Sequence, residues 1–280
     1  MPAFIARLTA SLGLVIASFT LTASLAGSAL SQDAPPRADQ YEHLTDFLAC
    51  TGNPYALCYY SGPEEPTPPG QSQTPPLPCS IDGPLRADCT CYAIADGPVL
   101  DVLHYNFVLV DSILNPSARE ATIAQCGEDG RGCLNMAYLA TGYCDPDDPA
   151  IAEKAECQAA PVCSQLGDLE SGTGQTLYDD PEVELISTFS FAYSQIHDFG
   201  SHSCAANNIR LYAGCMTAPC GEAGEDGLTQ CSCPLYDGEY QVGQDHEGLQ
   251  CNILPNVWSA ADNAIEMPLS PPGRLAGGEQ

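Results

Sequence analysis

A pattern of three cysteines that occurs twice constrains this chain more than any other feature. Pro78-Cys79 is followed by Cys89-Thr90-Cys91, and Pro219-Cys220 is followed by Cys231-Ser232-Cys233. Nine residues separate the first cysteine from the pair in the first copy, and ten do so in the second. The repeated spacing predicts one small disulfide-braced unit that is present twice.

All sixteen cysteines follow an N-terminal export signal, and an even number in an exported chain indicates disulfide bonds. A redox site would have Cys-x-x-Cys spacing, and a zinc site would need thiolates with two to four residues between them, kept reduced against an oxidising outside medium. Neither pair has that spacing, so we predict structural disulfides. The cysteines concerned are Cys50, Cys58, Cys79, Cys89, Cys91, Cys126, Cys133, Cys144, Cys157, Cys163, Cys204, Cys215, Cys220, Cys231, Cys233 and Cys251.

The Cys-x-Cys pairs predict how each unit is braced. Residues i and i+2 of a strand project to the same face, and two such thiols cannot easily adopt disulfide geometry with each other. Each thiol should therefore bond to a different neighbouring segment. Five cysteines fall in each unit, so each needs a sixth partner: Cys251 for the second unit, and Cys126 or Cys133 for the first.

The first 31 residues resemble a secretory signal peptide. Arg7 precedes an apolar run of small residues from Leu8 to about Ala26, and cleavage sites follow at Ala29 or Ser31. Six serines and threonines interrupt the run, which makes a membrane anchor the weaker reading. We expect an exported protein, periplasmic or extracellular, with no membrane span in the mature chain.

The net charge of −28 restricts the possible partners. A chain with 36 acidic and 8 basic residues repels nucleic acid and anionic lipid surfaces, so both are excluded as partners. An extracytoplasmic protein or a glycan remains as a ligand. No cofactor is predicted. Acidic turns such as Asp145-Pro146-Asp147-Asp148 could bind Ca²⁺, but they lack the form of a calcium loop, and solvated turns explain them better.

The pattern of residues predicts a mainly β, disulfide-rich fold of two similar small lobes with a short helical insert between them. The first lobe is expected at 42–116 with a proline-rich loop at 62–78, the insert at 117–183, and the second lobe at 184–262. A disordered tail is expected at 263–280. Strands are predicted at Val99 to Val110 and at Val183 to Tyr193, from their alternating apolar residues.

Helices of the insert are expected to begin at two capping sequences. Ser117-Ala118-Arg119-Glu120 has the spacing of a capping box. Asp148-Pro149 fits an N-cap followed by proline at the first helical position, with a helix over Ala150 to Gln158.

Candidate catalytic residues are sparse. His197, Asp198 and His202 form the one histidine cluster, and they combine a base, an acid and nearby hydroxyls. A polar loop leading to Cys204 explains the same residues without chemistry. Tyr59-Tyr60 and Tyr212, beside Cys58 and Cys215, could line a shallow groove, although tyrosine is also a common strand residue and we favour that explanation.

Three hypotheses for function follow from these observations. The leading one is a non-catalytic binding or envelope-associated protein whose contact surface is the loops between the cysteines. The second is a secreted hydrolase with a polar site between the lobes. The third is an extracytoplasmic metal-binding protein.

Overall fold

The computed structural model describes residues 38–63, 77–94, 105–145, 147–166, 177–192, 201–204, 211–245, 249–251, 254–268 and 270–276. All of them belong to one compact unit, Pro35–Gln280. The predicted signal peptide, most of the proline-rich loop and the segment 95–104 lie outside the described residues. None of the helices described there has both the length and the apolar composition needed to cross a bilayer.

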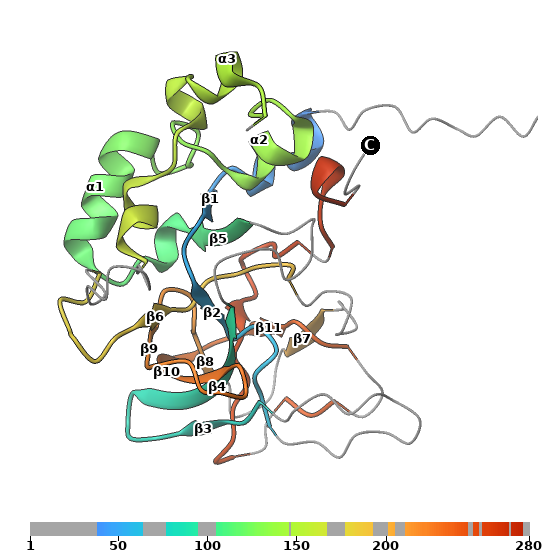
Figure 1. The fold of residues 1–280 in the computed structure, drawn as a ribbon. Coiled ribbons are helices and arrows are strands. Elements are labelled where there is room, and N and C mark those ends of the chain that lie inside the picture. The colour runs from blue at the N-terminus through green and yellow to red at the C-terminus, as the bar shows by residue number, and fades with distance from the viewer. Residues whose placement is uncertain are drawn as a thin grey trace, which may run out of the picture. The chain divides into compact units, whose positions relative to one another are not determined.

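Short strands dominate the described chain, and its helices are few and short (Figure 1). The strands are β1 (Phe47–Thr51), β2 (Tyr55–Leu57), β3 (Cys79–Ile81), β4 (Arg86–Ile94), β5 (Tyr105–Leu109), β6 (Leu185–Ile186), β7 (His202–Cys204), β8 (Leu211–Ala213), β9 (Pro219–Cys220), β10 (Leu228–Asp237), β11 (Tyr240–Val242) and β12 (Ala261–Asp262). The α-helices are α1 (Pro116–Cys126), α2 (Met136–Thr141) and α3 (Pro149–Ala152). The 3-10 helices are η1 (Ala38–Leu44), η2 (Val110–Ser112), η3 (Ala155–Cys157), η4 (Pro161–Gln165) and η5 (Gly273–Ala276).

Seven strands form the main sheet, in which β2, β4, β10, β9 and β6 follow in order, while β3 also pairs with β4 and β8 with β10. The two longest strands, β4 and β10, are antiparallel neighbours. At the middle of their ladder Cys231 lies opposite Cys89. The two Cys-x-Cys segments are therefore adjacent strands of a single sheet.

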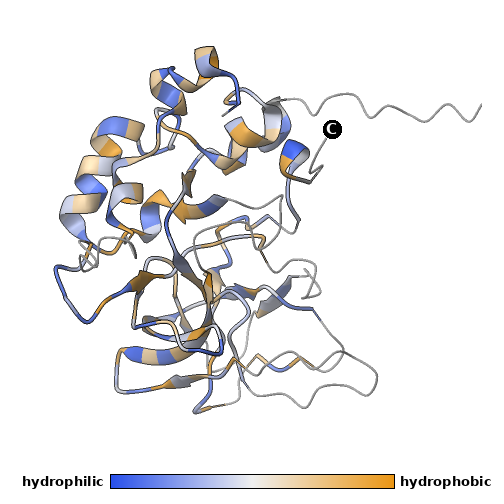
Figure 2. Cartoon of the chain, in the orientation of Figure 1, coloured by the Kyte–Doolittle hydropathy of each residue, from blue (hydrophilic) through white to orange (hydrophobic). Residues whose placement is uncertain are grey.

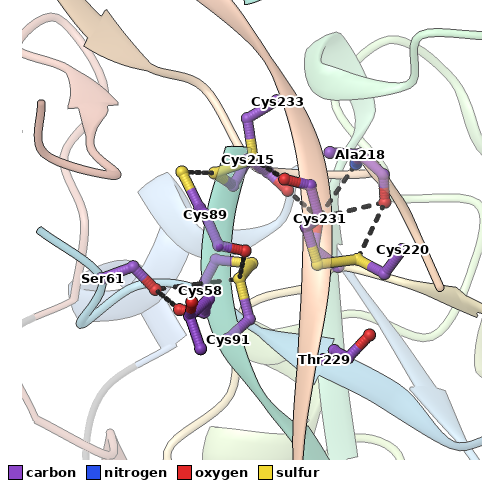
Figure 3. Close-up of a disulfide and its surroundings, with 12 residues drawn as sticks. Cys58, Ser61, Cys89, Cys91, Cys215, Ala218, Cys220, Thr229, Cys231 and Cys233 are labelled. Carbon is purple, nitrogen blue, oxygen red and sulfur yellow. Dashed lines mark hydrogen bonds between the residues drawn. A yellow bond between two sulfur atoms is a disulfide. The ribbon is translucent and has the colours of Figure 1, made fainter. Parts of the chain in front are cut away.

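Each Cys-x-Cys pair bonds to two different segments, which confirms the prediction from strand geometry. Cys89 bonds to Cys79 and Cys91 to Cys58, whereas Cys231 bonds to Cys220 and Cys233 to Cys215. Figure 3 shows the sulfurs of Cys89, Cys91, Cys231 and Cys233 beside the β4–β10 pair. All eight cysteines are at most 4% exposed, and the Sγ atoms of Cys89 and Cys215 lie 3.6 Å apart. Four disulfides therefore form much of the interior on this side of the sheet.

The remaining cysteines form four further disulfides. Cys204 bonds to Cys251, as predicted for the second unit. The prediction for the first unit is wrong, because Cys126 and Cys133 bond to each other and Cys50 bonds to Cys163. The chain turns sharply after α1, where Gly132 N donates to Cys126 O at 2.8 Å, and this turn brings Cys133 back onto the helix end. Cys144–Cys157 completes the set.

A second, aromatic part of the core lies where β1 and β5 pair. Their register places Ala49 opposite Phe107, and Phe107 in turn bridges to Phe189 of the segment after β6. Phe189 packs edge-on against Phe191 at 5.0 Å and against Tyr59 at 5.2 Å. The predicted strand at Val99 to Val110 is described from Tyr105 onward, as β5 followed by η2.

The predicted strand at Val183 to Tyr193 is regular only over β6. Its next residues pair with different neighbours in turn: Ser187 bridges to Ala56, Thr188 N donates to Ala56 O, and Phe189 bridges to Phe107. All residues from Leu185 to Ala192 are buried. The segment is enclosed on both faces and crosses from the main sheet to the β1–β5 pair, so it does not continue as one ladder.

Helices fill the predicted insert, and their ends follow local capping. Asn115, not Ser117, caps α1, since its side chain accepts a hydrogen bond from Ala118 N at 3.0 Å. Asp148 caps α3 as predicted, with Pro149 at the first helical position, but the α-helix ends at Ala152. Figure 2 shows hydrophilic and hydrophobic residues mixed along α1, of which only the face of Ala118, Thr122 and Cys126 is buried.

The segment expected to be a disordered tail has defined contacts over its described residues. Met267 and Leu275 belong to the same buried cluster as Phe47 and Phe107. Arg274 Nη1 lies 3.0 Å from Asp145 Oδ2, and Gly273 packs against the carbonyl of Ala140 at the end of α2. This part of the chain therefore covers α2.

Candidate functional site

A cavity of about 290 Å³ lies where the two cysteine units meet the segments after β5 and β6. Cys58 and Tyr59, which follow β2, contribute one side. Tyr212, Gly214, Cys215 and Met216, in and after β8, contribute the other. Further lining residues come from the end of β5 and η2, from Thr188 and Phe189, from the end of β10, and from the stretch Ser259 to Met267.

Two disulfides hold the walls of this cavity. Cys58 is bonded to Cys91 of β4, and Cys215 is bonded to Cys233 of β10. Because β4 and β10 pair directly, the lining of the cavity is linked to the rigid centre of the sheet by covalent bonds. The cavity is therefore held open by the scaffold and does not need a ligand to form.

Tyr212 and Tyr236 form an aromatic part of the lining. The ring of Tyr212 packs in a tilted arrangement against Tyr236, with centroids 5.7 Å apart, and against Tyr240 behind it, with centroids 5.2 Å apart. Tyr236 packs on the backbone of Gly214, where an added Cβ would overlap its ring. Tyr212 is 5% exposed and Tyr236 is 42% exposed, so Tyr236 is the ring that a ligand can reach from solvent.

Met216, which also lines the cavity, is followed by a strained residue. Thr217 has φ of 58°, which is rare for a β-branched side chain. Four hydrogen bonds hold it: its N–H donates to Ser187 O, its Oγ1 donates to Ser112 O and accepts from Leu114 N, and its carbonyl accepts from the Tyr178 hydroxyl. Backbone strain of this kind persists only where the surroundings enforce it, and it often marks functional sites.

Two aspartates supply the charge of the cavity. Asp111 and Asp262 both line it and are both exposed, and Asp111 forms an ion pair with Arg119 outside the lining. Asp262 Oδ1 accepts a hydrogen bond from Ala264 N at 2.8 Å. Burial, together with Asp262 and Tyr236, raises the pKa of Tyr212 to about 12, so this hydroxyl stays protonated at neutral pH.

The described lining thus combines aromatic and aliphatic surface with carboxylate and hydroxyl groups. Among these lining residues none is His, Lys or Arg. Such a set can pack against an apolar face and accept hydrogen bonds from a neutral or cationic ligand, and it repels anions. The sequence favoured ordinary strand residues over a groove for these tyrosines, but Tyr59 and Tyr212 both line this cavity, whereas Tyr60 is not among its described lining residues.

Only His202 of the predicted histidine cluster falls within the described residues. His197 and Asp198 are outside the described residues. His202 begins β7, and its Nδ1 lies 3.5 Å from Asp245 Oδ1. It does not line the cavity.

Cysteines and acidic turns are groups of the described chain that could hold a metal ion. Cys58 lies with Cys215 and Cys233, and also with Cys220 and Cys231, so that the sulfurs of each group are within 4.8 Å of one another. All of these sulfurs are in disulfides, so none is the thiolate that a metal needs. In the acidic turn, Asp145 pairs with Arg274 and Asp148 caps α3, which gives both carboxylates structural roles.

Three of the cavity's polar and aromatic residues gave no signal in the sequence. Asp111, Tyr236 and Asp262 stand in ordinary strand-end and turn contexts, in η2, β10 and β12, and only the packing of these distant elements brings them to one cavity. The chain matches no protein-family model, and comparisons with curated proteins and with solved structures found no significant match.

Proposed function

We propose that this chain is an exported, non-catalytic binding protein of the cell envelope or the outside medium, and that it holds a small ligand in the cavity described above. Its many disulfides are typical of proteins outside the cytosol. The signal-like sequence at 1–31 supports export by a secretory route. The observation that carries the binding proposal is a preformed apolar cavity with an accessible tyrosine and two carboxylates.

We further propose that the two cysteine units are copies of one ancestral unit. Each unit has the same two disulfides. The first cysteine of the Cys-x-Cys pair bonds to the strand just before it in the chain, and the second cysteine bonds to a residue just after an earlier strand. The pair Cys89 and Cys231, at the centre of the β4–β10 ladder, occupies corresponding positions in the two patterns. If a twofold axis through this pair related two copies of one unit, their Cys-x-Cys strands would pair antiparallel, as identical edge strands do in a symmetric dimer.

The ligand class that fits best is a single sugar unit of a glycan. Tyr236 offers a flat apolar surface for the C–H face of a sugar ring, and Asp262 and Asp111 offer acceptors for its hydroxyl groups. The volume of about 290 Å³ is at the small end of ligand pockets, which suits one ring better than an oligosaccharide. The overall charge of −28 favours neutral or amino sugars over acidic ones.

Replacing Tyr236 with alanine is expected to weaken glycan binding about tenfold or more, since it removes the exposed stacking surface. Tyr236→Phe should retain most of the affinity. Binding is measured first on an array of neutral, amino and acidic glycans, and then by titration calorimetry with the best monosaccharide.

Tyr143→Ala is the matched control, because Tyr143 is 45% exposed and lies after α2, outside the cavity lining. The proposal is contradicted if no glycan binds, or if Tyr236→Ala and Tyr143→Ala change the affinity equally.

A secreted hydrolase is the second candidate, because two carboxylates at one cavity are the groups that glycosidases use as acid and base. This candidate predicts slow release of sugar or a chromogenic leaving group by the wild type, lost in both Asp111→Asn and Asp262→Asn. Binding without turnover by the wild type would eliminate the hydrolase and keep the binding protein.

A further inference from the structure

Of the sixteen cysteines, Cys251 alone is not buried. The other fifteen are at most 8% exposed, and Cys204, the disulfide partner of Cys251, is 4% exposed. An attacking thiolate must reach a sulfur along the axis of the disulfide bond, so accessibility largely decides which disulfide can exchange. Cys204–Cys251 is therefore the disulfide most open to reaction with a thiol from solvent.

A histidine lies beside this disulfide. His202 precedes Cys204 by two residues on β7, so both side chains project to the same face of the strand. One ring nitrogen of His202, Cys204 Sγ and Cys251 Sγ all lie within 4.8 Å of one another. None of the other seven disulfides forms such a group with a histidine among the described residues.

Asp245 completes the arrangement. Its Oδ1 lies 3.5 Å from Nδ1 of His202, so the carboxylate can orient the imidazole ring. The two side chains are partly exposed, at 38% for His202 and 61% for Asp245. The pair can therefore exchange protons with solvent while it faces the disulfide.

The backbone around the site is well held. β7 pairs with β11, with Cys204 opposite Tyr240 and His202 opposite Val242. The Tyr240 hydroxyl donates to Cys251 O, and Trp258 Nε1 donates to the neighbouring Gln250 O at 2.8 Å. Opening the disulfide would leave both cysteines near their present places, which favours reclosure.

We propose that Cys204–Cys251 is a thiol–disulfide exchange site that takes electrons from an external dithiol. The thiolate of the dithiol attacks Cys251 Sγ and forms a mixed disulfide, while the Cys204–Cys251 bond breaks and its electron pair leaves on Cys204. His202 donates a proton or a hydrogen bond to this leaving sulfur. The second thiol of the donor then attacks the mixed disulfide and releases Cys251. The donor ends as a disulfide, and the protein has gained two electrons and two protons.

A ring nitrogen of His202 lies within 4.8 Å of both reacting sulfurs, so His202 is assigned as the catalytic residue, while Asp245 is a positioning residue that acts through His202. Limiting dithiothreitol tests this assignment on the full protein. Acid quenching, alkylation with N-ethylmaleimide and peptide mass spectrometry then give the rate at which each disulfide opens. We expect Cys204 and Cys251 to be labelled at least about tenfold faster than any other pair.

His202→Gln should slow this step about tenfold, and Asp245→Asn should slow it by a smaller factor. His43→Gln is the matched control, since His43 is exposed at the end of η1 and touches no disulfide. Circular dichroism of the oxidised variants checks that each is folded, so that a slower rate reflects the chemistry. The proposal is overturned if another disulfide opens first, or if His202→Gln leaves the rate equal to that of His43→Gln.

Discussion

Replacing Cys50 and Cys163 together with alanine is expected to lower the free energy of unfolding by about 4–5 kcal/mol. This disulfide joins residues 113 positions apart, from β1 to η4, and so restricts the unfolded chain more than any other in the protein. Nested disulfides shorten the loop that it closes, but only slightly reduce the effect, because the entropy depends on the logarithm of the length. Urea unfolding followed by circular dichroism measures the loss.

Cys126→Ala with Cys133→Ala provides a matched control. These two cysteines belong to the same buried cluster as Cys50 and Cys163. The double variant therefore removes two sulfur atoms from that cluster, as the first double variant does. Their disulfide joins residues only seven positions apart, so the expected loss is about 2 kcal/mol. Equal losses in the two double variants would contradict both the pairing and the entropic explanation.

Gly62→Ala is expected to cost about 2–3 kcal/mol of unfolding free energy. A Cβ on Gly62 would overlap the ring of Trp258, which is 2% exposed and is fixed by a hydrogen bond from Nε1 to Gln250 O. The ring is rigid and enclosed, so either the tryptophan or the backbone at Gly62 must move. Trp258 is the one tryptophan of the chain, so its fluorescence reports the displacement directly during urea unfolding.

Gly221→Ala is the control for this substitution. Gly221 follows β9, and a Cβ there would meet no atom within 4 Å. We expect its stability to stay within about 0.5 kcal/mol of the wild type and its tryptophan emission to be unchanged. If Gly62→Ala has the same stability and tryptophan emission as Gly221→Ala, Trp258 does not pack closely on Gly62.

Local rules predicted that the cysteines form disulfides and that neither Cys-x-Cys pair bonds internally, but they assigned no individual pair. The i, i+2 geometry of Cys89 and Cys91 is enough to forbid their mutual bond and to require two partners. Asp148 followed by Pro149 is enough to start a helix. These features depend on residues close in sequence, where backbone geometry leaves few choices.

Features that depend on distant segments could not be predicted in this way. The pairing of β4 with β10 follows from no local signal, and the choice of Cys163 as the partner of Cys50 depends on where η4 packs against β1. The cavity could not be predicted from the sequence for the same reason. Tyr236 of β10 and Asp262 of β12 belong to different sheets, and only the packing of these distant segments brings them to one cavity with Tyr59.

The two cysteine units pair with each other in one sheet, through β4 and β10, and the four disulfides around this pair each join two cysteines of the same unit. Mapping the disulfides of the unreduced protein tests this most directly, with peptic digestion and electron-transfer fragmentation to separate Cys89 from Cys91 and Cys231 from Cys233. The expected pairs are Cys58–Cys91, Cys79–Cys89, Cys215–Cys233 and Cys220–Cys231. A bond within either Cys-x-Cys pair, or between the units, as from Cys89 to Cys215, would contradict the claim.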